Sequence, residues 1–159
     1  MTYLQATTAL HTLLRRARML TAVAAITLAA LPGTSAYADG QDKSVIGQWK
    51  LTQVLDSSEI TALDDDQAQR LVGKTLTISQ DKVQLGDRVC TDPDFEVTVA
   101  ERDLFFASQA HASAAQLDLP DPVTAVHVNC TYVYKKTPDK LVVYWKGFFF
   151  DAVRERRTK

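Results

Sequence analysis

The sequence predicts a mainly β domain, a small antiparallel barrel or sandwich of about seven or eight strands with one or two short helices. Two observations carry this prediction. Short runs in which apolar and polar residues alternate recur from Gly47 onward, and turn-forming residues separate them. Helical periodicity is confined to brief segments. The 159-residue chain has no internal repeats or low-complexity linkers, so we expect one folded domain.

The first predicted element of the domain is a strand that begins at Gly47. Its alternation places three apolar side chains on one face: Trp49, Leu51 and Leu55. Three aspartates at positions 64–66, good helix formers after them and Gly73 then predict a short capped helix. The aspartates lack the alternating spacing of a calcium-binding loop, so helix capping explains them better.

The remaining strands are predicted where β-branched and aromatic residues alternate between turn residues, at 75–78, 83–85, 95–99, 123–134, 141–145 and 148–153. The long strand 123–134 would place five side chains on one face: Val126, Val128, Cys130, Tyr132 and Tyr134. Turns are expected at Gln80-Asp81, Pro138-Asp139 and Lys146-Gly147. Residues 100–117 fit either a strand, through Leu104 to Phe106, or a helix, through the alanine-rich run that follows.

The first 38 residues have the layout of a secretory signal peptide. A basic cluster (Arg15, Arg16 and Arg18) precedes an apolar run over residues 19–31, and small residues occupy positions 36 and 38. The run is too short to span a bilayer as a stable helix, which needs about 20 residues. We expect cleavage after Ala38 and a periplasmic or secreted protein, exported by the general secretory or the twin-arginine route.

These boundaries predict a signal peptide over residues 1–38, a single β-barrel domain over residues 39–153 and a polar C-terminal tail over residues 154–159. Cleavage leaves 121 residues, and their formal charge is −4 rather than −1 because three arginines leave with the signal. A mildly acidic domain disfavours nucleic acid and anionic membranes as partners. The sequence contains no second long apolar run, so no membrane span is predicted.

Cys90 and Cys130 both lie in the predicted mature domain. In an oxidising compartment two cysteines most simply form one disulfide. Closing a loop of about 40 residues would stabilise the fold by about 4 kcal/mol. No CxxC spacing exists, and only His111 and His127 would add imidazoles within the domain, so neither a metal site nor a cofactor is predicted.

The tripeptide Gly47-Gln48-Trp49 opens the first predicted strand. Here the chain resembles the lipocalin and wider calycin families, whose first barrel strand opens with G-x-W. The resemblance implies that the glycine lets the chain bend into the barrel and that Trp49 plugs the closed end. It further implies that an arginine of the final strand, by position Arg154, packs across the tryptophan ring. Without the resemblance, Trp49 also fits as an ordinary core anchor.

Tyr144 and Phe149 alternate away from the presumed core face of the last two strands and form a candidate binding surface. Burial on both faces of the sheet, under the helix, would use the same residues. No catalytic residues are predicted, since no G-x-S-x-G motif and no glycine-rich phosphate loop occur. We therefore expect a non-catalytic exported barrel that binds another protein, for example as a hydrolase inhibitor. The alternative, implied by the resemblance, is binding of a small apolar ligand in the barrel mouth.

Overall fold

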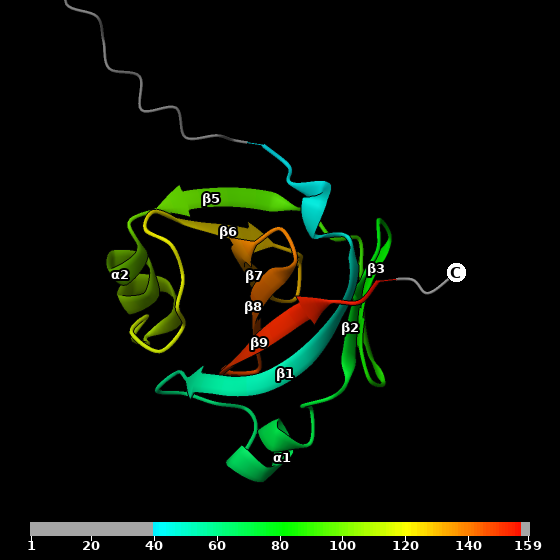
Figure 1. Ribbon diagram of the computed structural model, residues 1–159, viewed down its shortest axis with the longest axis horizontal. Helices are drawn as coiled ribbons and strands as arrows, with labels where there is room; N and C mark the ends of the chain where they lie inside the picture. The colour runs from blue at the N-terminus through cyan, green and yellow to red at the C-terminus, as the bar shows by residue number, and fades with distance from the viewer. Residues whose placement is uncertain (1–39, 157–159) are drawn as a thin grey trace, which may run out of the picture. The chain divides into compact units, whose positions relative to one another are not determined.

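The computed structural model describes residues 40–156, which form one curled, antiparallel sheet of nine strands with a few short helices (Figure 1). The mainly β fold is confirmed, whereas the predicted signal peptide lies outside the described residues. In chain order the elements are η1 (Lys43–Val45), β1 (Gly47–Ser57), α1 (Asp65–Gln69), β2 (Thr75–Ile78), β3 (Lys82–Leu85), β4 (Arg88–Thr91), β5 (Glu96–Ala100), α2 (Arg102–Phe105), η2 (Phe106–Ala110), β6 (Val123–His127), β7 (Tyr132–Thr137), β8 (Lys140–Trp145) and β9 (Phe148–Arg154).

The strand order is β4-β3-β2-β1-β9-β8-β7-β6-β5. Each strand pairs with its neighbours in the chain, except that β4 and β5 do not pair and β1 pairs with β9 instead. The sheet therefore has two edges, β4 and β5. The segment before η1 follows part of the β5 edge, because Asp42 N donates to Phe95 O at 3.0 Å and Val97 N donates to Gly40 O at 3.1 Å.

Two separate cores bury the two faces of strands β6–β9. The inner core packs these strands against β1, β2 and β3; it includes Trp49, Leu51, Leu76, Ile78, Val83, Leu85, Val126, Val133, Val143 and Phe150. The outer core lies under α2, η2 and the segment after them; it includes Phe105, Phe106, Leu117, Leu119, Val123, Tyr134, Val142 and Phe149. Figure 1 shows α2 on one side of β6–β9, with β2 and β3 on the other. Burial on both faces explains why β8 and β9 are nearly continuous apolar runs.

The expected alternation of β1 is wrong at Leu55. The register of β1 against β9 shifts between Leu51 and Gln53 and again between Val54 and Asp56. Each bulge adds a residue and bends the strand, so the face on which later side chains lie changes. Val54 consequently packs against the inner core, and Leu55 packs against the outer one.

The predicted long strand 123–134 is also wrong: it is a hairpin of β6 and β7. The chain reverses at Asn129, which adopts a positive φ of 69°. Asparagine tolerates this left-handed conformation better than most residues. The reversal places Val133 in the inner core and Tyr134 in the outer one, so the predicted common face of Val126 and Tyr134 does not exist.

Four other elements of the structure agree with or differ from those predicted from the sequence: α1, the segment over 102–110, β4 and the end of β9. The capped helix is confirmed as α1, in which Asp64 and Gln67 form a reciprocal capping box. Residues 102–110 of the ambiguous segment are helical, as α2 and η2. Strand β4, over 88–91, was missed because a Gly86-Asp87 turn makes it a short edge hairpin strand. Arg154 belongs to β9 rather than to the polar tail.

Candidate functional site

Trp49 and Arg154 meet at the end of the sheet covered by η1. Trp49 is 1% exposed, and its indole Nε1 donates to Val45 O at 2.8 Å. The guanidinium carbon of Arg154 lies 4.0 Å from the centroid of the Trp49 ring, which is a cation–π contact. Arg154 therefore lies where the resemblance predicted it.

Arg154 also fastens η1 to the end of β9. Its Nη1 donates to Ile46 O at 3.0 Å and its Nη2 donates to Ser44 O at 2.8 Å. The carbonyl oxygens of Ser44 and Ile46 would otherwise need water as a hydrogen-bond donor. The guanidinium supplies a donor to both of them. Gly47 makes room for this arrangement, because a Cβ there would lie 2.6 Å from Arg154 Nη1.

A cavity of about 610 Å³ lies at this same end of the sheet. We call it the basic hollow. Its apolar wall includes Val45, Trp49 and Leu141, and its cations are Lys135, Lys136 and Arg154. Ser44 of η1, Thr124 of β6, Thr137 of β7 and the loop residues Pro120 and Pro138 complete the lining, and no aspartate or glutamate is among the described lining residues.

The two lysines of the basic hollow are held by carboxylates that lie outside its lining. Lys135 Nζ is 2.7 Å from Asp42 Oδ2 and 3.0 Å from Ser44 Oγ. Lys136 Nζ is 2.9 Å from Asp151 Oδ1 and 3.6 Å from Asp118 Oδ2. An ammonium has three donors, so each lysine retains one beyond these two contacts. Asp151 is thus an ion-pair partner on the outer face of β9.

The pKa of Asp42 reflects its place beside Lys135. Partial burial raises the pKa of this carboxyl, but hydrogen bonds from Lys135 and Ser44 outweigh burial and lower it below its ordinary value. The Asp42–Lys135 pair is therefore charged at neutral pH, which fixes the ammonium at the rim of the basic hollow.

Tyr144 and Phe149 do not form the predicted exposed surface. Phe149 is 0% exposed, and Tyr144 is half-buried with its hydroxyl 3.2 Å from Ser58 Oγ. Their alternation away from the inner core is correct, but α2 and η2 cover that face. In the same cluster, burial raises the pKa of the Tyr134 phenol, and Tyr144 and Tyr132 nearby raise it further. The alternative of two-sided burial is the one the structure shows.

Cys90 and Cys130 form a disulfide, with Cα atoms 6.2 Å apart. The bond joins edge strand β4 to the turn between β6 and β7, and Asn129 in that turn donates from Nδ2 to Thr91 O at 2.6 Å. The predicted pairing is confirmed. It ties one edge of the sheet to a hairpin that it does not otherwise pair with.

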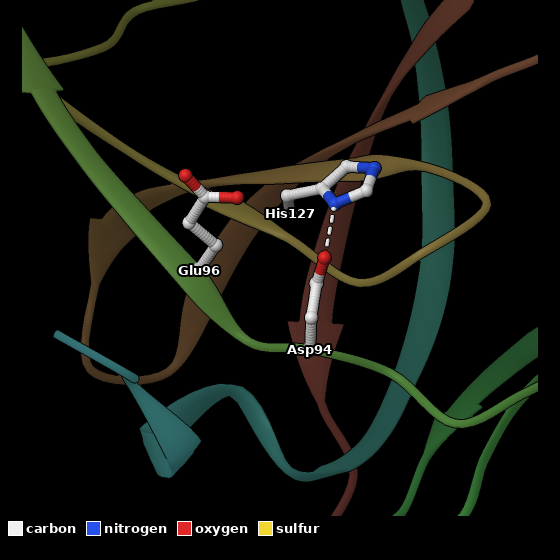
Figure 2. A group of neighbouring side chains, drawn as sticks. All are labelled: Asp94, Glu96 and His127. Carbon is white, nitrogen blue, oxygen red and sulfur yellow. Dashed lines mark hydrogen bonds and ion pairs between the residues drawn. The ribbon is translucent and has the colours of Figure 1, made fainter. Parts of the chain in front are cut away.

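A cluster of three polar side chains, Asp94, Glu96 and His127, lies where β5 and β6 pair (Figure 2). His127 Nδ1 is 2.8 Å from Asp94 Oδ2, and Glu96 lies directly across from His127 in the β5–β6 pairing. One side-chain atom from each of the three residues lies within 4.8 Å of the other two. The sequence analysis predicted no metal site and missed this cluster, because only the β5–β6 register brings the three residues together.

Comparison with known proteins gives no family for this chain: no family model matches it, and no curated protein and no solved structure matches it significantly. Among residues 40–156, no helix has the length and apolar character needed to cross a membrane.

Proposed function

We propose that this protein is an exported, lipocalin-like barrel that binds a small molecule with an anionic head and an apolar body in the basic hollow. The observation that carries the proposal is the lining of this cavity: among the described residues it has three cations and no carboxylate, together with an apolar wall that includes Trp49 and Leu141. The volume of about 610 Å³ falls within the range of about 300–1,000 Å³ that small-molecule sites occupy.

The positions of the cations support an anionic ligand. Lys135 and Lys136 are fixed by ion pairs, so binding would cost little additional side-chain entropy. The spare donor of Lys135, beside η1, would hydrogen-bond a carboxylate or similar group. Charge-assisted hydrogen bonds of this kind contribute about 1.5–3 kcal/mol each. The apolar wall would receive the rest of the ligand.

The test is displacement of anilinonaphthalene sulfonate, a fluorescent anion with an apolar body, by octanoate and by octanol. Octanoate should displace the probe at concentrations at least about tenfold lower than octanol, because only the carboxylate uses the lysine donors. Lys135→Gln should lower the affinity for octanoate about tenfold. Lys140→Gln, an exposed lysine of the same β7–β8 hairpin, is the matched control and should change nothing. Equal displacement by octanoate and octanol, or an unaffected Lys135→Gln protein, would contradict the proposal.

A protein partner is the second candidate, and a different feature supports it. Beyond Val97 the free edge of β5 has no described backbone partner, and Val99 is 45% exposed. The N–H of Val99 points to this edge, since that of Val97 does so two residues earlier. An extended segment of a hydrolase or another protein would add there as a further strand.

Val99→Pro tests this second candidate, because proline removes the outward N–H without removing a bond to β6. A partner retained from periplasmic extract by the original protein should be lost by Val99→Pro at unchanged thermal stability. Retention of the same partners by both proteins would exclude the β5 edge.

Export is proposed on the predicted signal peptide, and the Cys90–Cys130 disulfide supports it because such bonds persist in oxidising compartments. Intact-mass measurement of protein recovered outside the cytoplasm should show loss of residues 1–38. A secreted form that keeps Arg15 and Arg16 would overturn the cleavage prediction.

A further inference from the structure

We propose that Asp94, Glu96 and His127 form a binding site for a divalent transition-metal ion such as Zn²⁺ (Figure 2). The three residues come from different places in the chain. Asp94 lies in the loop before β5, Glu96 is the first residue of β5, and His127 is the last residue of β6. The sheet register alone brings them together, because Glu96 and His127 are cross-strand partners.

The distances suit first-row metal coordination after a small adjustment. Zinc binds imidazole nitrogen and carboxylate oxygen at about 2.0–2.2 Å, so two ligand atoms of a tetrahedral site lie roughly 3.3 Å apart. His127 Nδ1 and Asp94 Oδ2 are 2.8 Å apart. The third ligand atom, from Glu96, lies within 4.8 Å of both. Glu96 is exposed, so its side chain can rotate inward without displacing a packed neighbour.

The charge of the cluster favours a cation. Two carboxylates face one imidazole, and within residues 40–156 no lysine or arginine forms an ion pair with Asp94 or Glu96. Glu96 makes no described side-chain hydrogen bond, so its carboxylate is available as a ligand. A divalent ion would neutralise both carboxylates and replace the Asp94–His127 hydrogen bond with two metal bonds.

The imidazole is held in place before any ion binds. Tyr132 is the cross-strand partner of His127 on β7, and the two ring centroids lie 4.8 Å apart. The contact with Tyr132 restricts rotation of the His127 side chain, so this side chain would lose little freedom when it binds a metal ion. The imidazole also decides the class of metal, because Ca²⁺ and Mg²⁺ prefer sites built from oxygen, whereas Zn²⁺, Cu²⁺ and Ni²⁺ accept nitrogen. Three protein ligands leave a fourth position for water.

Titration of the tag-free protein with zinc chloride tests the proposal, by calorimetry and by amide NMR spectra. We expect one ion per chain, a higher melting temperature with zinc, and amide shifts centred on residues 94–97 and 126–132. Calcium chloride should produce none of these effects. Absence of zinc binding, or amide shifts centred elsewhere, for example around His111, would overturn the proposal.

Substitutions locate the ligands. Glu96→Gln should lower the affinity for zinc at least about tenfold. The Glu96 side chain has no described structural contact, so this variant should fold and keep the test valid even if His127→Gln does not fold. Folded His127→Gln should bind no zinc. The matched controls, Glu59→Gln and His111→Gln, change an exposed carboxylate and an exposed imidazole and should bind as the original protein does. Unchanged affinity in Glu96→Gln and His127→Gln would also overturn the site.

Discussion

Arg154 lies across the face of Trp49, with its guanidinium carbon 4.0 Å from the ring centroid. Gly47 lies next to the same guanidinium and has no side chain to displace it. The contact joins the first and last strands of the sheet, in which Trp49 and Arg154 are paired residues. It also secures η1 through the carbonyls of Ser44 and Ile46. The three-residue G-x-W pattern thus has a physical reason in this fold, whatever the ancestry of the chain.

Gly47→Ala should lower the free energy of unfolding by about 2–3 kcal/mol. Its Cβ would lie 2.6 Å from Arg154 Nη1, so the guanidinium must shift, which weakens its contacts with the Trp49 ring and the two carbonyl acceptors. Gly86→Ala is the control, because Gly86 also has a positive φ (59°) but no atom within 4 Å of an added Cβ. Urea unfolding of Gly47→Ala, Arg154→Ala and the double variant should be strongly non-additive. Additive losses would show that the glycine acts independently of Arg154.

Phe149→Ala should destabilise the fold by about 3–5 kcal/mol, as expected for a fully buried large aromatic residue. Leu104→Ala, on the exposed side of α2, should change stability by less than about 0.5 kcal/mol, since Leu104 is 71% exposed. Chemical denaturation measures both. A small effect of Phe149→Ala would mean that α2 and η2 do not cover the outer face in solution.

Replacing both Cys90 and Cys130 by serine should lower the free energy of unfolding by about 4 kcal/mol, because the bond closes a loop of 40 residues in the unfolded chain. Reduction of the original protein with dithiothreitol should produce a similar loss, and the reductant should leave the double serine variant unchanged. Equal stability of the oxidised and reduced proteins would contradict this prediction.

Acid should weaken the contact between the η1 segment and β7. The folded-state pKa of Asp42 is lowered from its ordinary 3.8, so the Asp42–Lys135 pair stabilises the fold above about pH 4. That contribution is lost as the pH falls further through the folded-state pKa. The pair is partly exposed, so its contribution should stay below about 1 kcal/mol.

Asp42→Asn measures this contribution, because asparagine still caps η1 and lacks only the charge. The difference in stability between the original protein and Asp42→Asn should be present at pH 7 and vanish near pH 2. Asp87→Asn, in the exposed β3–β4 turn, is the matched control and should leave the stability as it is at pH 7. A constant difference at both pH values would assign the effect to something other than the ion pair.

The sequence predicted the fold class because most of its signals are local. The Asp64 capping residue and the turns at Pro138 and Lys146 each act over a few residues, and they are confirmed. The errors arose where tertiary pairing decides the outcome. The bulges in β1 moved Leu55 to the other face, and the positive φ of Asn129 divided a predicted strand into a hairpin.

The candidate sites were predicted less completely than the fold. The Trp49–Arg154 contact followed from a motif, and the disulfide followed from the count of cysteines. The basic hollow could not be foreseen, because it combines residues from η1, β1, β6, β7, β8 and β9. The Asp94–Glu96–His127 cluster was equally inaccessible, since two separated segments must first adopt one register.

The last strand, β9, lies between β1 and β8 and makes the strand pairing that joins the two halves of the sheet. Strands β1–β4 and strands β5–β8 are each complete meanders before the final residues are made, but they share no strand pairing until β9 arrives. Pairing of the first strand with the last makes the contacts highly non-local, and such topologies fold slowly. An oxidised protein truncated before Phe148 would therefore keep no strand pairing between its two four-stranded halves, and only the chain itself and the Cys90–Cys130 bond would link them.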